Sequence, residues 1–153
     1  MRDKITAMMK QSLKDKDQVA LSPTRLIMAA LKDRDIAARG SDNHDGIGDD
    51  EILGMLQTMI KQRTESAEMY RDGNRQELAI AEEEEIRIIR TFLPAQLTAD
   101  EIDAAIADAI AATRASSVKD MGQLMAYLKR NFAGQMDFSA VSQAVKTALM
   151  SKD

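Results

Sequence analysis

Apolar residues recur at the spacing of an α-helix in successive segments of this 153-residue chain. In the first part of the chain the pattern predicts four helices, over residues 2–16, 22–38, 49–72 and 74–92. Ser22 followed by Pro23 indicates the start of the second helix, because Ser is a favourable N-cap and Pro fits the first helical position. Gly73 is expected to end the third helix with a positive φ, and Asn74 with Glu77 is typical of a capping box that opens the fourth.

The stretch around Pro94 is the expected joint between two parts of the chain. Pro94 disfavours helix for the residue before it, so the fourth helix should end close to Phe92. Thr98 with Glu101 is a further capping-box pattern, and Asp137 is an expected cap for the last of three more helices. The sequence therefore predicts an all-α fold, with an N-terminal four-helix domain over residues 1–94 and a small three-helix bundle over residues 95–153.

The faces of these helices follow from the same pattern. Leu26, Leu78 and Val118 are among the apolar residues that are expected to face a core. The short connection at Gly73 predicts that the third and fourth helices form an antiparallel hairpin.

Two charged residues interrupt the apolar stripes of this hairpin. Arg63 falls inside the stripe of the third helix and Glu85 inside that of the fourth, at nearly the same height counted from Gly73. A charge on an apolar stripe is costly unless it is paired, so we expect Arg63 and Glu85 to form a structural ion pair. The alternative is that both side chains reach water along their aliphatic stems.

Composition narrows the chemistry of the chain. Hydrophobic residues make up 44% and charged residues 30%, which is typical of a globular protein. Cysteine is absent, which excludes disulfides, thiolate ligands and Cys nucleophiles. With a single histidine, a zinc site would consist almost wholly of carboxylates, so we expect no metal and no cofactor. No apolar run approaches the roughly 18 residues that span a membrane, and the polar N-terminus lacks a signal-peptide core, so we expect a cytoplasmic protein.

The loop at residues 39–48 is the most polar segment and contains the histidine, His44. Asn43, Asp45 and Gly46 match positions 3, 5 and 6 of a calcium-binding loop. Positions 1 and 12 of such a loop would be Ser41 and Ile52, so the two most demanding ligands are missing and we reject calcium binding. His44 is most simply a solvated loop residue. Because the chain also lacks a Gly-rich phosphate loop and a histidine near Ser116–Ser117 in the sequence, no catalytic residue is expected.

Several stretches resemble the GatB/YqeY family. They are residues 61–70 (KQRTESAEMY), residues 85–97 with their ending FLPAQL, and residues 116–122 (SSVKDMG). Residues 24–32 and 134–138 are similar to the stand-alone, YqeY-like members. The likeness covers nearly the whole chain in order, and the loop around His44 departs from it.

The resemblance implies an all-helical protein with a larger N-terminal domain and a small C-terminal bundle. That bundle is similar to the tail domain of the B subunit of the tRNA-dependent amidotransferase, which amidates Glu or Asp mischarged on tRNA. In that enzyme the tail engages tRNA, whereas the activating and glutaminase sites lie elsewhere. The family label is carbon–nitrogen ligase with glutamine as amido-N-donor, but no residue of this chain is expected to perform that reaction.

The distribution of charge along the chain indicates which kind of partner it can bind. The net charge of −4 argues against a dedicated nucleic-acid binder but allows a local basic face. Residues 115–152 have a balance of +3, whereas residues 98–113 are purely acidic. We expect tRNA, or a tRNA-modifying or tRNA-charging enzyme, as the partner, with Lys119, Lys129 and Arg130 as the RNA-binding residues. Helical projection places Lys119 within about 20° of Arg130. The alternative is a helical protein–protein interaction module without RNA contact, in which these cations form only a solvated face.

Overall fold

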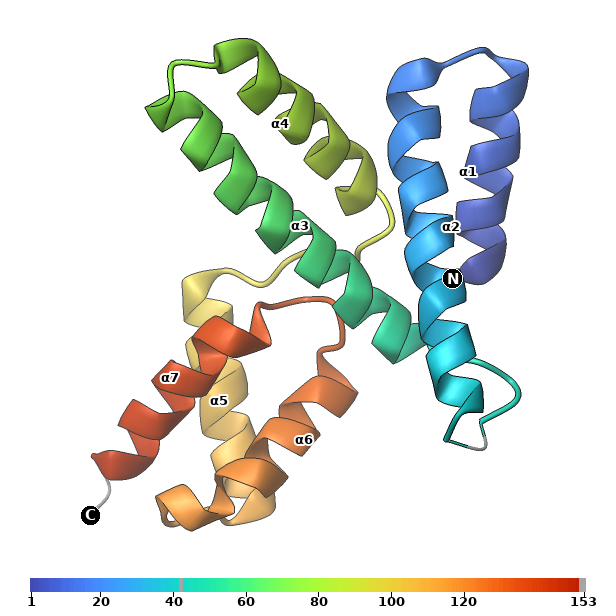
Figure 1. Ribbon diagram of the computed structural model, residues 1–153. Coiled ribbons are helices and arrows are strands. Elements are labelled where there is room, and N and C mark those ends of the chain that lie inside the picture. The colour runs from blue at the N-terminus through green and yellow to red at the C-terminus, as the bar shows by residue number, and fades with distance from the viewer. Residues whose placement is uncertain (42, 152–153) are drawn as a thin grey trace. The chain divides into compact units, whose positions relative to one another are not determined.

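The computed structural model describes residues 1–41 and 43–151 (Figure 1). In this part of the chain all regular structure is helical. The helices are α1 (Arg2–Lys14), α2 (Gln18–Arg39), α3 (Asp49–Asp72), α4 (Gln76–Arg90), α5 (Ala99–Thr113), the short 3₁₀ helix η1 (Val118–Asp120), α6 (Met121–Asn131) and α7 (Phe138–Met150). The predicted all-α fold is confirmed.

The chain divides into two compact units, Met1–Leu93 and the residues from Pro94 onward. In the first unit α1 pairs with α2 and α3 pairs with α4, and α2 also packs against α4. The core of this unit is formed by residues from all four helices, including Ile5, Ile27, Ile52, Leu56 and Ile89, which are wholly buried.

The second unit is a three-helix arrangement in which α5 packs on α6 and α6 packs on α7. Its core includes Ala109, Leu124, Leu128, Val145 and Leu149, all wholly buried. Both predicted start signals in this unit are confirmed. The Thr98 hydroxyl accepts the Glu101 N–H at 3.3 Å while Glu101 accepts the Thr98 N–H at 2.8 Å, and Asp137 caps α7 by accepting the Ser139 N–H at 2.9 Å.

The start of α2 differs from the prediction. Asp17 is the N-cap, and its Oδ1 accepts the N–H groups of Val19 at 3.1 Å and Ala20 at 3.2 Å. Pro23 therefore lies inside α2, and its missing N–H leaves the Val19 carbonyl without the usual helical partner. Val19 is 53% exposed, whereas Pro23 is buried. The Ser22–Pro23 signal was wrong because Asp17 is also a favourable N-cap and starts the helix before Ser22 is reached.

The tip of the α3–α4 hairpin also differs. Asn74, not Gly73, takes the left-handed conformation, with φ of +56°, whereas Gly73 has φ of −84°. The N–H of Arg75 then donates to the carbonyl of Tyr70 at 2.8 Å, which closes the end of α3. Arg75 is the N-cap of α4 without a side-chain cap, so the expected Asn74–Glu77 capping box is wrong. Asn tolerates positive φ better than most residues, which explains the exchange of roles.

Three apolar residues expected in a core are exposed: Leu26 by 45%, Leu78 by 36% and Val118 by 37%. On α4 the buried face is formed by Ala79, Ile86 and Ile89. Residues 78–81 are all apolar, so periodicity alone does not decide which face of α4 is buried. The two alternatives differ by a rotation of about 100° about the helix axis, the angle between neighbouring residues.

Candidate functional site

The three predicted RNA-binding residues all lie exposed in the second unit. Lys119 belongs to η1, whereas Lys129 and Arg130 lie in the last turn of α6. Lys119 precedes α6, and the rise from Met121 to Arg130 within α6 alone is about 14 Å. The structure therefore brings Lys129 and Arg130 together and leaves Lys119 at the opposite end of α6. Because η1 turns faster than an α-helix, the projected alignment of Lys119 with Arg130 is displaced by roughly 40°.

The turn that carries Lys119 is organised by Asp120. The Asp120 Oδ2 accepts the backbone N–H groups of Ser116 at 2.9 Å and of Ser117 at 3.0 Å. These backbone hydrogen bonds, with lesser contributions from the two serine hydroxyls, lower the pKa of Asp120. The carboxylate is therefore a positioning group for the SSVKD turn, and it holds η1 at the start of α6.

Lys129 and Arg130 have a structural role at their helix end. They lie in the last turn of α6, where a cation interacts favourably with the negative end of the helix dipole. Within the described ranges, neither residue nor Lys119 forms an ion pair with an acidic side chain. The three cations are therefore available to an anionic partner.

Charge is segregated between the helices of this unit. α5 carries acidic residues and no cation: Asp100, Glu101, Asp103 and Asp108. α6 and α7 carry cations and no acidic residue: Lys129, Arg130 and Lys146. An anionic ligand is thus attracted to α6 and α7 and repelled by α5.

Arg63 and Glu85 lie together in the first unit. The Nε of Arg63 donates to Oε2 of Glu85 at 2.7 Å, and Nη1 of Arg63 lies 3.4 Å from the carbonyl oxygen of Met59. The pair joins α3 to α4, and its geometry is that of a structural contact.

Sequence reasoning missed a second, more extensive ion pair. The guanidinium of Arg2 binds both carboxylate oxygens of Asp35, at 2.6 and 2.7 Å, and also donates to the carbonyl of Ile47 at 2.7 Å. The N–H of Ile47 donates to Asp35 at 2.9 Å. The hydrogen bonds from Arg2 lower the pKa of Asp35 to about 2. This cluster, Arg2–Asp35–Ile47, joins the start of α1, the end of α2 and the loop before α3.

A side chain at position 46 would clash with the Arg2–Asp35–Ile47 cluster. Gly46 has φ of +84°, and a Cβ at this position would lie 2.5 Å from Oδ1 of Asp35 and 2.9 Å from Nη2 of Arg2. Asn43 is used within the loop, where its side-chain amide donates to the Gly46 carbonyl at 3.0 Å. His44 is exposed. Across residues 1–41 and 43–151, no group of three or more His, Asp or Glu side chains is arranged to hold a metal ion.

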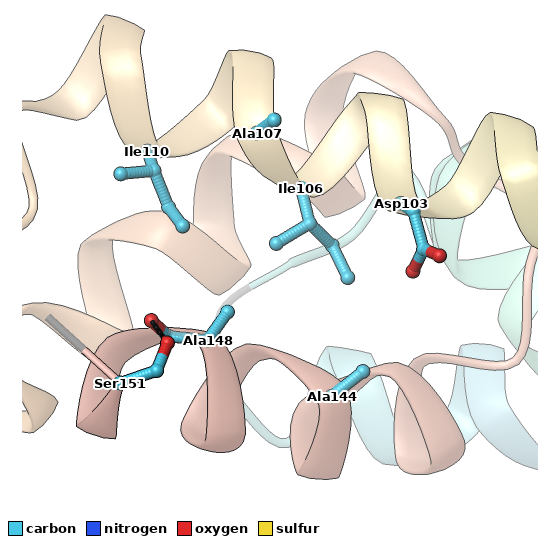
Figure 2. A pocket seen from close by; sticks show the side chains of 7 residues that line it. All are labelled: Asp103, Ile106, Ala107, Ile110, Ala144, Ala148 and Ser151. Atoms are coloured by element: carbon cyan, nitrogen blue, oxygen red, sulfur yellow. Dashed lines mark hydrogen bonds between the residues drawn. The ribbon is translucent and has the colours of Figure 1, made fainter.

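A groove of about 350 Å³ lies between α5 and α7. Figure 2 shows the two helices side by side with the lining side chains between them. The lining residues are Asp103, Ile106, Ala107, Ile110, Ala144, Ala148 and Ser151. Most of these side chains are apolar and several are small, so the groove suits an apolar ligand surface and offers little for chemistry.

Comparison with known proteins gives two findings. The family model described as "Yqey-like protein" matches residues 2–149. The protein "Altered inheritance of mitochondria protein 41, mitochondrial" of Vanderwaltozyma polyspora is 28% identical over 85 residues. That match covers 56% of this chain and 44% of the relative, so it spans less than half of the relative's length. In the described part of the chain no helix has the length and apolar character of a membrane span.

Proposed function

The chain belongs to the family of YqeY-like proteins, and on this ground we propose that it is a non-catalytic, tRNA-associated helical protein. The observation that supports the proposal best is the set of exposed cations at the two ends of α6, Lys119 at one end and Lys129 with Arg130 at the other. They lie in the unit that resembles the tRNA-engaging tail of the amidotransferase B subunit. The partner is tRNA itself or an enzyme that modifies or charges tRNA.

The contacts in this proposal are to phosphates. The aromatic residues of the second unit, Tyr127, Phe132 and Phe138, are half-buried and pack against its core, so they offer no stacking platform for bases. Basic positions before the start of α6 and in its last turn suit phosphates at separate points of a folded RNA better than a single anion. Little sequence preference is therefore expected.

A gel-shift titration with bulk tRNA tests the proposal. The variant Lys119→Ala/Lys129→Ala/Arg130→Ala should bind more weakly than the unaltered protein. The matched control is Lys10→Ala/Lys32→Ala/Lys61→Ala, which removes the same charge from exposed positions of the first unit. The control should bind nearly as well as the unaltered protein. Equal loss in both variants, equal affinity of all three proteins, or absence of binding at low salt contradicts the proposed site.

The proposal assigns no reaction to the chain. The family label of carbon–nitrogen ligase with glutamine as amido-N-donor predicts release of glutamate from glutamine in the presence of mischarged tRNA and ATP. We expect none from the purified protein, and measurable release would contradict a non-catalytic role. The cytoplasmic location stays a prediction, since the relative's name places that protein in mitochondria.

The second candidate function is a protein–protein interaction module without RNA contact. The apolar groove between α5 and α7 favours it. The two candidates differ in their response to salt, because phosphate contacts weaken steeply with ionic strength and an apolar interface does not.

A further inference from the structure

The walls of the α5–α7 groove have the dimensions of a short helix. On α5 the lining residues run from Asp103 to Ile110, and on α7 from Ala144 to Ser151. Each wall is about two helical turns, or roughly 10 Å, long. Lining positions recur three or four residues apart on both helices, so the groove follows the helix axes and is elongated. In Figure 2 α5 and α7 run in the same direction along it.

The surface of the groove is apolar, with small residues at its edges. Ile106 and Ile110 are 4% and 7% exposed and belong to the core of the unit, so they form a fixed floor. Ala107 and Ala144 are exposed and leave room for a close approach from outside. Elongated apolar grooves of this kind accept an amphipathic helix whose apolar side chains repeat every three or four residues.

The charge at the groove has one sign. Asp103 is the charged residue among those that line it, and α5 carries no cation. Lys146 lies two residues from Ala144, so it points about 160° away from the groove-lining face of α7. A partner segment that fits this groove therefore carries positive charge beside Asp103.

We propose that the groove binds an amphipathic helix of a partner protein, with Lys or Arg in its last turn beside Asp103. The N-terminal ends of α5 and α7 both lie toward the Asp103–Ala144 end of the groove (Figure 2). A bound helix that runs antiparallel to them brings its negative C-terminal end close to their positive ends, and its C-terminal cations close to Asp103. The proposal does not depend on the proposed RNA contact, which uses the ends of α6.

Peptide selection on the full-length protein tests this proposal. The probe is a displayed library of 14-residue amphipathic helices with Ala, Leu, Ile or Met on one face and Lys, Gln or Glu at each end. We expect enrichment of apolar residues at helical spacing with Lys at the C-terminal end. Asp103→Lys should weaken the selected peptide about five- to tenfold and favour Glu at that end. The charge-matched control Asp108→Lys, on α5 outside the groove lining, should change affinity less than twofold.

A steric variant separates groove binding from general attraction. Ala144→Leu narrows the groove and should weaken the peptide at least tenfold, whereas Ala126→Leu, at an exposed position of α6, should not. Circular dichroism melts verify that both variants fold. Absence of enriched peptides, equal effects of Asp103→Lys and Asp108→Lys, or binding that survives Ala144→Leu overturns the proposal. Self-association of the unaltered protein that Ala144→Leu abolishes also overturns it, since a second copy would then occupy the groove.

Discussion

Arg63 on α3 and Glu85 on α4 form an ion pair with Nε 2.7 Å from Oε2, and their side chains are only 14% and 27% exposed. Ion pairs on open surfaces contribute little because water and salt screen them. This pair is largely removed from water, so each charge depends on the other for compensation. It joins the two helices along the faces that they bury.

Removing one residue of this pair should therefore lower the free energy of unfolding more than removing both residues. We expect Arg63→Met to lower the free energy of unfolding by about 2 kcal/mol, less than for a fully buried pair because Glu85 keeps some contact with water. The double variant Arg63→Met/Glu85→Met should recover much of this loss. Urea unfolding of the single and double variants gives the coupling energy. Small and additive effects would contradict a coupled pair.

Asp35 should make stability depend on pH below about 4. The hydrogen bonds from Arg2 hold its pKa at about 2 in the folded protein, below the ordinary value of 3.8. A depressed pKa stabilises the fold above the unfolded value and ceases to do so as the pH falls through the folded value, here from about 4 to about 2. Asp35→Asn should lower the free energy of unfolding by about 1–2 kcal/mol at pH 7 and by almost nothing near pH 2. The effect at pH 7 is modest because the pair is partly exposed and therefore screened by water. Urea unfolding of both proteins from pH 7 to pH 2 measures this difference, and a constant difference would contradict the assignment.

Gly46→Ala should disturb the Arg2–Asp35–Ile47 cluster. A methyl group here meets the carboxylate of Asp35 at 2.5 Å and must also adopt a positive φ, so we expect a loss of about 2 kcal/mol or more. The matched control is Gly54→Ala in α3, where a Cβ meets no atom within 4 Å. That change should stabilise the protein by about 0.5–1 kcal/mol, because Ala favours a helix interior. Thermal melts of both variants compare the two, and similar effects would argue against the steric explanation.

The second unit should fold without the first. A fragment of residues 95–153 contains α5, α6 and α7 with their shared core. Because this core is small and rich in Ala, we expect helical circular dichroism and a cooperative but low-temperature melt. A fragment without helical signal would show that the unit depends on residues 1–94.

Binding of tRNA should weaken with salt by a defined amount. Neutralisation of about three phosphates predicts that log K falls with log salt concentration with a slope of about −2 to −3. The variant that lacks Lys119, Lys129 and Arg130 should show a slope near zero. Titrations between 50 and 200 mM salt measure both slopes, and a shallow slope for the unaltered protein would favour the interaction-module alternative.

Local signals predicted much of this fold, because they act within one turn of the chain. The capping box of Thr98 and Glu101 and the cap at Asp137 depend on residues two or three positions apart. The positions of Arg63 and Glu85 followed from counting outward along a hairpin whose tip was visible in the sequence. The predicted helix start at Ser22–Pro23 was wrong because Pro23 and Asp17 both favour a helix start, and the sequence does not show which of the two prevails.

The pattern of apolar and polar residues did not predict contacts between residues that are far apart in the sequence. Arg2 and Asp35 are 33 positions apart and neither interrupts an apolar stripe, so nothing in the sequence paired them. The requirement for glycine at position 46 depends on the Arg2–Asp35 pair, so the sequence did not predict it either. The helical projection of Lys119 beside Arg130 holds only for a continuous α-helix, whereas the Asp120 turn gives η1 the geometry of a 3₁₀ helix. The length of α6 keeps Lys119 away from Arg130, but the faces that remain exposed depend on packing against α5 and α7.

The division at Leu93–Pro94 gives each compact unit its own optical signal. The chain has two tyrosines and no tryptophan, with Tyr70 in α3 and Tyr127 in α6. Each tyrosine is half-buried, so unfolding changes its surroundings. Replacing Tyr127 by Phe leaves an emission signal from the first unit alone, and replacing Tyr70 by Phe leaves one from the second. The order in which the two units unfold can therefore be recorded by fluorescence without an attached dye.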